Sequence, residues 1–188
     1  VLKKAAGLDI QMLLPLHGFV WRQDLGYILG KYDLWSRYEP EQRGVVIAYA
    51  SVYGGTENAA NILACRLREQ GVQVEMFDTS VTPASYILAA AFRFSHVVLA
   101  APTYNGGVFV TMENLLHDLT AHGLKGRRAA YIENGSWAPT SARGMQKLLE
   151  PLNWETAADT VTLRSALRQG QQEDLERMAA QLAESVKA

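Results

Sequence analysis

The sequence predicts an α/β fold in which a doubly wound parallel sheet is flanked by helices. From Gly44 onward, short apolar runs alternate with amphipathic stretches, as strands and helices do when they follow one another along a chain. The amphipathic stretches space their apolar residues by three or four positions, and the first of them ends at Gly71. The chain has 188 residues and is 48% hydrophobic, which suffices for the core of one domain with an appendage.

Five apolar runs are expected to form the strands, and the third of them, centred on Val97, Val98 and Leu99, is the most hydrophobic. The predicted strands span residues 45–50, 72–77, 95–101, 128–133 and 160–163. The predicted helices span residues 57–70, 84–92, 109–122, 142–149 and 171–187. Residues 44–188 are therefore expected to make up one α/β domain.

Residues 1–43 do not follow this alternation. They are expected to comprise, in order, an apolar run (10–16), a His17-Gly18 turn, a helix rich in aromatic residues (24–38) and a polar linker that contains Pro40 (37–43).

Composition excludes several classes of function. The 18 Lys and Arg residues against 19 Asp and Glu give a net charge of −1, so the basic excess typical of nucleic-acid-binding proteins is absent. The single cysteine, Cys65, excludes a disulfide framework and makes a reducing cytoplasm the expected location. Cys65 lies near Leu63 and Leu67 on a predicted helix and is expected to pack in the core. No signal peptide or transmembrane run is visible, so no membrane partner is expected.

Three loops follow the carboxyl ends of predicted strands, where open parallel sheets bind their ligands. Each loop is rich in glycine, hydroxyl, amide or aromatic groups. The residues that we expect to bind a ligand are Ser51, Val52, Tyr53, Gly54, Gly55, Thr56, Pro102, Thr103, Tyr104, Asn105, Gly106, Gly107, Asn134, Gly135, Ser136 and Trp137.

The first loop, from Ser51 to Thr56, has the composition of a phosphate site. Hydroxyl groups at both ends and glycines between them would wrap backbone N–H groups around an anion, and the following helix adds the positive end of its dipole. No Lys or Arg lies between Gly44 and Cys65, which excludes a Walker A motif, and the G-x-G-x-x-G spacing of dinucleotide folds is missing. Asp78 is therefore assigned a turn or cap role instead of ribose binding. The alternative for the loop is that Thr56 only caps the helix.

The second and third loops each offer an aromatic side chain, Tyr104 and Trp137. Two aromatic residues beside a phosphate site suit a flat heteroaromatic ligand that stacks against them. Asn105 and Gly106 can adopt left-handed or flipped peptide geometry at little cost. The alternative is that both aromatic residues are exposed turn residues.

The three loops resemble the FMN site of the flavodoxin fold, through Ser51-Val-Tyr-Gly-Gly-Thr-Glu57, Pro102-Thr-Tyr-Asn-Gly-Gly107 and Asn134-Gly-Ser-Trp137. Residues 48–57 are most similar to the flavodoxin domain of A-type flavoproteins, the flavodiiron proteins. The resemblance implies a three-layer flavodoxin-like fold, with a five-stranded parallel sheet in the order 2-1-3-4-5 and helices on both faces. It also implies that FMN is the cofactor.

The resemblance assigns a role to each loop. Ser51, Thr56 and the backbone amides of residues 53–55 would hold the FMN phosphate. The second loop would border one side of the flavin ring and the third loop the other, and the 105–106 peptide would adapt to the protonation of flavin N5. Glu133 would either disfavour negative charge on the flavin or point into solvent.

The opening segment resembles the end of the di-iron domain of the same family. Residues 13–22 are similar to a Pro-Ser-His-Gly-x-x-Trp-Arg stretch that supplies the last histidine ligand, so His17 occupies the family's metal-ligand position. Residues 1–43 are accordingly expected to be the remnant of the C-terminal end of a metallo-β-lactamase-like domain plus a linker, and Val1 is expected to be a cut end.

The di-iron site itself is not expected in this chain. The family's His-x-Glu-x-Asp-His motif is missing, and one histidine cannot hold two irons, so His17 is expected to pack or face solvent. The sequence also departs from the family at Leu16, which is usually Ser, at Gly55, which is often Asn, and in the third loop, which is commonly Ser-Tyr-Gly-Trp.

The resemblance implies an electron-transfer function. Such a domain passes electrons from rubredoxin or an NAD(P)H-linked flavin reductase through FMN to a di-iron site that reduces O2 or NO, in a protein that is typically a homodimer. No carboxylate pair, Ser-His-Asp set or activated cysteine presents itself as a catalytic centre, so no catalytic residue is expected in this chain.

Two alternatives stay open. A free-standing FMN-dependent NAD(P)H:quinone-type reductase shares the fold but does not account for the segment around His17. A non-enzymatic flavodoxin-like interaction module would bind no flavin. A response-regulator receiver is excluded, because Ser51 and Pro102-Thr103 stand where it needs an acidic pair and a phospho-acceptor Asp.

Overall fold

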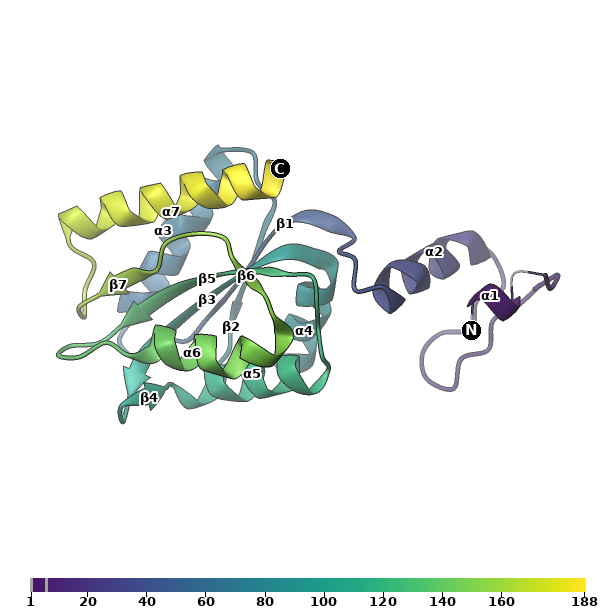
Figure 1. Ribbon diagram of the computed structural model, residues 1–188, viewed down its shortest axis with the longest axis horizontal. Helices are drawn as coiled ribbons and strands as arrows, with labels where there is room; N and C mark the ends of the chain where they lie inside the picture. Colours follow the sequence, from purple (N-terminus) through teal and green to yellow (C-terminus); the bar gives the residue numbers. More distant parts are fainter. Residues whose placement is uncertain (1, 6) are drawn as a thin grey trace. The chain divides into compact units, whose positions relative to one another are not determined.

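The computed structural model describes residues 2–5 and 7–188, which form two compact units, Val1–Glu39 and Pro40–Ala188 (Figure 1). The first strand of the larger unit begins at Gln42, so Gln42 and Arg43 belong to the sheet and not to the predicted linker. No helix within the described residues has both the length and the apolar character to cross a membrane.

The larger unit is built on a sheet in the order β2-β1-β3-β5-β6, and the pairings along this path are parallel. Its strands are β1 Gln42–Tyr49, β2 Val74–Asp78, β3 Phe94–Tyr104, β4 Gly107–Val108, β5 Arg128–Asn134, β6 Glu155–Thr156 and β7 Val161–Leu163. The expected α/β class and parallel sheet are confirmed, but the expected number of five strands is wrong, because the sheet has seven.

The two additional strands have local causes. The chain turns back at Asn105 and Gly106, whose φ angles of 49° and 74° are both left-handed, so β4 pairs antiparallel with the end of β3. The last position in the sheet is divided, because β6 pairs with the beginning of β5 and β7 with its end.

Helices cover both faces of the sheet (Figure 1). The helices α3 Gly55–Glu69 and α7 Gln169–Lys187 pack on one face, where Leu63, Leu67 and Leu182 share a buried cluster with strand residues such as Ile47 and Val98. The helices α4 Ala84–Arg93, α5 Val110–Ala121 and α6 Ser141–Leu149 cover the other face, and a short 3-10 helix, Glu150–Leu152, follows α6.

The positions of Cys65 and Asp78 test two predictions about single side chains. Cys65 is exposed, so the prediction that it packs in the core is wrong. The buried stripe of α3 runs through Ala60, Leu63 and Leu67, and Cys65 lies off this stripe. Asp78 accepts a hydrogen bond from the Ser80 N–H at 2.7 Å through Oδ1, which confirms its turn role.

The smaller unit contains the helices α1 Leu2–Ala5 and α2 Leu25–Ser36. Between them, Leu13 and Trp21 exchange two backbone hydrogen bonds, of 2.9 and 3.0 Å, around the predicted turn at His17 and Gly18. Neither helix buries a residue, and the exposed large apolar side chains of this unit include Leu8, Leu14, Leu16, Phe19 and Tyr27. The described part of this unit therefore has no buried core of its own.

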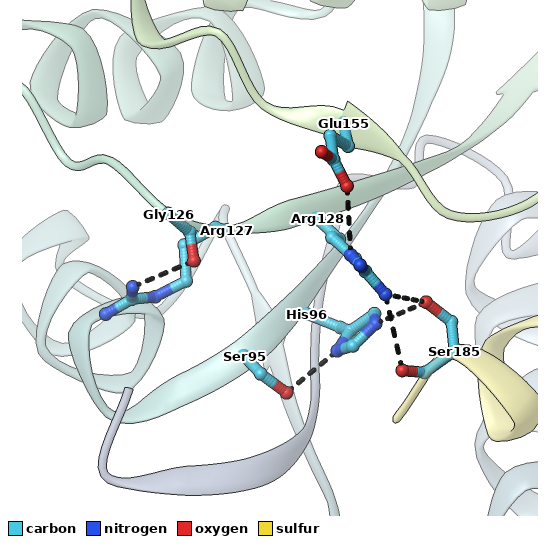
Figure 2. Close-up of polar contacts among 7 residues, drawn as sticks. All are labelled: Ser95, His96, Gly126, Arg127, Arg128, Glu155 and Ser185. Carbon is cyan, nitrogen blue, oxygen red and sulfur yellow. Dashed lines mark hydrogen bonds and ion pairs between the residues drawn. The ribbon is translucent and has the colours of Figure 1, made fainter. Parts of the chain in front are cut away.

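A buried histidine joins three elements at the amino ends of the strands (Figure 2). His96 is 3% exposed and contacts the Ser95 hydroxyl through Nδ1 at 2.8 Å and the Ser185 hydroxyl of α7 through Nε2 at 2.9 Å. Arg128 donates to the same Ser185 hydroxyl at 2.9 Å and pairs with Glu155 at 3.2 Å. Burial, followed by the nearby charge of Arg128, lowers the pKa of His96 from 6.5 to about 4.

We predict that the protein loses stability as the pH falls from 6.5 towards 4. In this window the unfolded chain protonates His96 and the folded chain does not, which lowers the free energy of unfolding by up to about 3 kcal/mol. Above pH 6.5 this group contributes no pH dependence. Urea unfolding of the wild type and His96→Gln at about pH 7 and about pH 4.5 tests this, because the amide does not titrate. The variant should lose less stability between the two conditions, and equal losses would contradict the prediction.

The end of α4 is held by the buried guanidinium of Arg127, which is 2% exposed. Its Nε donates to the Ala91 carbonyl at 2.7 Å and its Nη2 to the Phe92 carbonyl at 2.6 Å. Its Nη1 donates to the carbonyls of Lys125 and Gly126 at 3.0 and 3.2 Å, the second of which is drawn in Figure 2. Carbonyls in the last turn of a helix lack N–H donors within the helix, so the guanidinium of Arg127 supplies the missing donors to the Ala91 and Phe92 carbonyls. Burial lowers the pKa of Arg127 to about 10.

Replacing Arg127 with Met should lower the free energy of unfolding by about 2–4 kcal/mol, because buried carbonyls lose their donors. Arg127→Lys should also destabilise, since one ammonium cannot reproduce the spread of the guanidinium fork. Arg143→Met, at an exposed position of α6, is the matched control and should stay within about 0.5 kcal/mol of the wild type in urea unfolding. A result in which Arg127→Met unfolds like this control would show that Arg127 is not needed at the end of α4.

Candidate functional site

The carboxyl ends of β1, β3 and β5 meet at one edge of the sheet and border a cavity of about 370 Å³. Parallel pairing carries the loops that follow these strands to the same side, so residues distant in sequence share the cavity. The residues that line it are Ser51, Val52, Tyr53, Gly55, Thr56, Pro102, Thr103, Tyr104, Asn134, Gly135, Ser136, Ser165 and Ala166.

Ser51 organises the first loop. Its Oγ accepts hydrogen bonds from the N–H groups of Gly54 at 3.1 Å and Glu57 at 3.3 Å, so Ser51 satisfies a donor in the first turn of α3. Gly54 has a φ of 82°, a left-handed conformation that glycine adopts without strain. The alternative in which Thr56 caps the helix is wrong, because Thr56 lies inside α3 and is 2% exposed.

The start of α3 gives one end of the cavity a set of hydrogen-bond donors. Gly55 and Thr56 are the first two residues of this helix, and their N–H groups have no acceptor within it. These groups and the positive end of the helix dipole favour an anion. Burial, followed by the charges of Glu57 and Asp78, raises the pKa of Tyr49 at the end of β1. None of the described lining residues is Lys or Arg, so an anion at this end would be held by dipoles and hydrogen bonds alone.

A buried amide connects the first loop with the third. Asn134 is 7% exposed, and its Nδ2 donates to the Thr56 hydroxyl at 3.2 Å and to the Ser165 carbonyl at 2.9 Å. Its Oδ1 accepts from the Ser165 N–H at 2.9 Å. The side chain of Asn134 therefore fixes other lining residues, a role that the sequence did not indicate.

A fourth loop, residues 164–166 after β7, contributes Ser165 and Ala166 to the cavity, and we did not predict it. Ser165 has a left-handed φ of 66°, and its hydroxyl contacts that of Ser136 at 3.1 Å. A Cβ on Gly55 would lie 2.3 Å from the Ser165 carbonyl oxygen, so the 164–166 loop packs directly against the start of α3. The rule that located the other loops applies equally after β7, but the strand is short and the loop contains no glycine.

The second loop is part of the hairpin of β3 and β4 and is fixed by α6. The Thr103 hydroxyl oxygen accepts hydrogen bonds from the N–H groups of Thr140 at 2.8 Å and Ser141 at 3.1 Å. Thr140 in turn donates to the Gly106 carbonyl at 3.2 Å. Tyr104 stands at the cavity in an edge-to-face contact with Phe109, with ring centroids 5.6 Å apart.

Several predicted site residues do not line the cavity. They are Gly54, Asn105, Gly106, Gly107 and Trp137. Trp137 is 92% exposed, as expected for the alternative in which it is a surface residue, whereas Tyr104 does line the cavity. Glu133 neither faces the cavity nor stands free in solvent, because its carboxylate accepts from the Ala142 N–H at 3.1 Å and the Thr162 hydroxyl at 2.9 Å.

The described residues contain no group of three or more His, Cys, Asp or Glu side chains that could hold a metal ion. His17 is exposed in the smaller unit. The metal-ligand position that the resemblance assigns to His17 therefore has no ligand set around it within the described residues.

Comparisons with known proteins give the fold and a set of relatives. No family model matches the sequence. Nitric oxide reductase of Moorella thermoacetica is 29% identical over 143 residues, which are 76% of this chain and 35% of that protein. The chain spans between about a quarter and a half of the length of the curated relatives that it matches.

Two solved structures show the same fold. Rubredoxin oxygen:oxidoreductase from Desulfovibrio gigas matches with a TM-score of 0.90 and 22% identity, over 98% of this chain and 46% of that one. A flavodoxin of Streptococcus pneumoniae matches with a TM-score of 0.65 and 24% identity, over 75% of this chain and 98% of that one. The larger unit therefore has a flavodoxin-like α/β fold.

Proposed function

We propose that residues 44–188 form an FMN-binding electron-transfer domain of a flavodiiron-type oxidoreductase. The observation that supports this most directly is the cavity at the carboxyl edge, which combines an anion-binding end with an aromatic wall. The electron donor in this proposal is rubredoxin or an NAD(P)H-linked reductase, and the acceptor is a di-iron site that reduces O2 or NO. The name of the Desulfovibrio gigas relative supports a rubredoxin-type donor.

The residues of the cavity fit FMN at both ends of the molecule. The hydroxyl groups of Ser51 and Thr56, with the N–H groups at the start of α3, would bind the phosphate. Tyr104, which is 53% exposed, offers a ring face or edge against which the flavin can pack. When bound, FMN supplies the redox chemistry, and these side chains bind and orient it.

We further propose that residues 1–43 are the end of a metallo-β-lactamase-like domain. The smaller unit supports this, because Leu14, Leu16 and Phe19 are 71, 97 and 86% exposed and its helices bury no residue. Apolar side chains gathered in this way normally pack against further protein. The iron ligands would come from that domain.

The first test of this function is FMN uptake. We expect the chain to be purified with flavin absorbance in the visible, or to acquire it when FMN is added and the excess is removed. A protein that is colourless and takes up no FMN would contradict the proposal and favour a non-enzymatic interaction module. Steady-state oxidation of NAD(P)H by the FMN-loaded chain with a quinone, without a partner protein, would instead favour a free-standing reductase.

The second test concerns the phosphate. Replacing Ser51 and Thr56 together with Ala should weaken FMN binding at least tenfold, or about 1.4 kcal/mol, because two hydroxyl donors are lost. Ser85→Ala, an exposed hydroxyl in the first turn of α4, is the matched control and should leave the affinity unchanged. Flavin fluorescence titration measures both, and an unchanged Kd in the double variant would place the phosphate elsewhere.

A further inference from the structure

We propose that Asn134 is a positioning residue that directs the hydrogen of the Thr56 hydroxyl towards the cavity, and thereby favours a ligand group that accepts hydrogen bonds. This inference rests on the proposed function, because it concerns how the same site recognises the FMN phosphate. Asn134 acts through Thr56 and through the 164–166 loop.

The orientation of the Asn134 amide is fixed by backbone groups. The N–H of Ser165 can only donate and its carbonyl can only accept, and both lie 2.9 Å from the amide of Asn134. The oxygen Oδ1 must therefore face the N–H, and the nitrogen Nδ2 must face the carbonyl. A flipped amide would bring donor to donor and acceptor to acceptor.

The orientation of Asn134 decides the role of Thr56. The nitrogen Nδ2 carries two hydrogens and cannot accept, and its second neighbour is the Thr56 Oγ1 at 3.2 Å. The hydroxyl oxygen of Thr56 must accept from Asn134, so its single hydrogen points elsewhere. The hydrogen bonds among the described residues give that hydrogen no acceptor, and Thr56 lines the cavity.

The Ser51 hydroxyl is also left with its hydrogen available to donate, because backbone N–H groups occupy its oxygen. Its hydroxyl oxygen accepts from two backbone N–H groups, those of Gly54 and Glu57, which leaves its hydrogen to donate. Ser51 presents only its hydrogen, since two N–H groups occupy its lone pairs, and Thr56 presents its hydrogen beside one remaining lone pair. Phosphate oxygens accept and are charged, so they match the two hydroxyl hydrogens and the N–H groups at the start of α3, which outnumber the single lone pair left to Thr56.

The experiment compares FMN with riboflavin, which lacks the phosphate, by fluorescence titration of the full chain. In Asn134→Asp, which has nearly the same shape, a carboxylate oxygen replaces Nδ2 and accepts the Thr56 hydrogen, so that hydrogen leaves the cavity. The same oxygen faces the Ser165 carbonyl, and the loss of that hydrogen bond affects both ligands alike. We expect the Kd for FMN to rise at least about tenfold more than the Kd for riboflavin. Equal losses for both ligands would overturn the proposal, because they would indicate a purely structural role.

The added charge of the aspartate is controlled by a double-mutant cycle with Thr56→Val. If Asn134 acts through Thr56, the fold increase in the Kd for FMN that Asn134→Asp causes should be at least about three times smaller in the Thr56→Val background than in the wild type. An effect of full size in that background would overturn the proposal in favour of simple charge repulsion.

A further pair of variants keeps the test informative if Asn134→Asp does not fold. Thr56→Ser retains the hydroxyl and should bind FMN within about threefold of the wild type, whereas Thr56→Val should lose at least about tenfold for FMN alone. Wild-type affinity in Thr56→Val would overturn the proposal. A wild-type chain that binds riboflavin and FMN equally also overturns it, whereas one that binds neither overturns the proposed function itself.

Discussion

The parallel register of β1, β3 and β5 is the constraint on which the site depends. Tyr49 of β1 pairs with Ala100 of β3, and Pro102 of β3 pairs with Asn134 of β5, so the three strands reach the same edge within a few residues of one another. A slip of one residue would turn each side chain to the opposite face of the sheet. The cavity forms because β1, β3 and β5 end at the same edge of the sheet, which brings the loops that follow them together.

The two ends of the sheet use buried polar groups for different purposes. At the amino ends, His96 and Arg127 satisfy their hydrogen bonds within the protein and hold helices to strands. At the carboxyl ends, the amide of Asn134 is hydrogen-bonded to Thr56 and Ser165, and these two residues line a cavity. If the proposed site binds its ligand as we infer, binding depends on a residue whose own polar atoms are already hydrogen-bonded within the protein.

The strands and helices could be predicted because their signals are local. The apolar run around Val98 and the helical stripe through Leu63 and Leu67 report burial directly, and the glycine- and hydroxyl-rich loop at Ser51 marks the start of α3. The division of the last strand and the contribution of Ser165 could not be predicted in this way. Both depend on which residues of β5 remain free to pair, which is decided by contacts between segments distant in sequence.

The same limit applies to single side chains. Trp137 and Tyr104 are equivalent in the sequence, each being an aromatic residue in a loop after a strand, yet only Tyr104 lines the cavity. The sequence favours Thr56 as the residue that would cap the helix, but the hydrogen bonds show that Ser51 accepts the Glu57 N–H instead. Residue type identified the loops, and only the three-dimensional arrangement separated the residues within them.

The absence of Lys and Arg from the described lining of the cavity has a consequence for any protein that approaches this edge. An anion held by dipoles keeps its charge, since none of the described lining residues is a cation that would neutralise it. If FMN is the ligand, loading the site makes this face of the domain more negative by the full charge of the phosphate. A docking partner would therefore meet a different electrostatic potential on the loaded domain than on the empty one, and this difference would reach across about one Debye length of solvent.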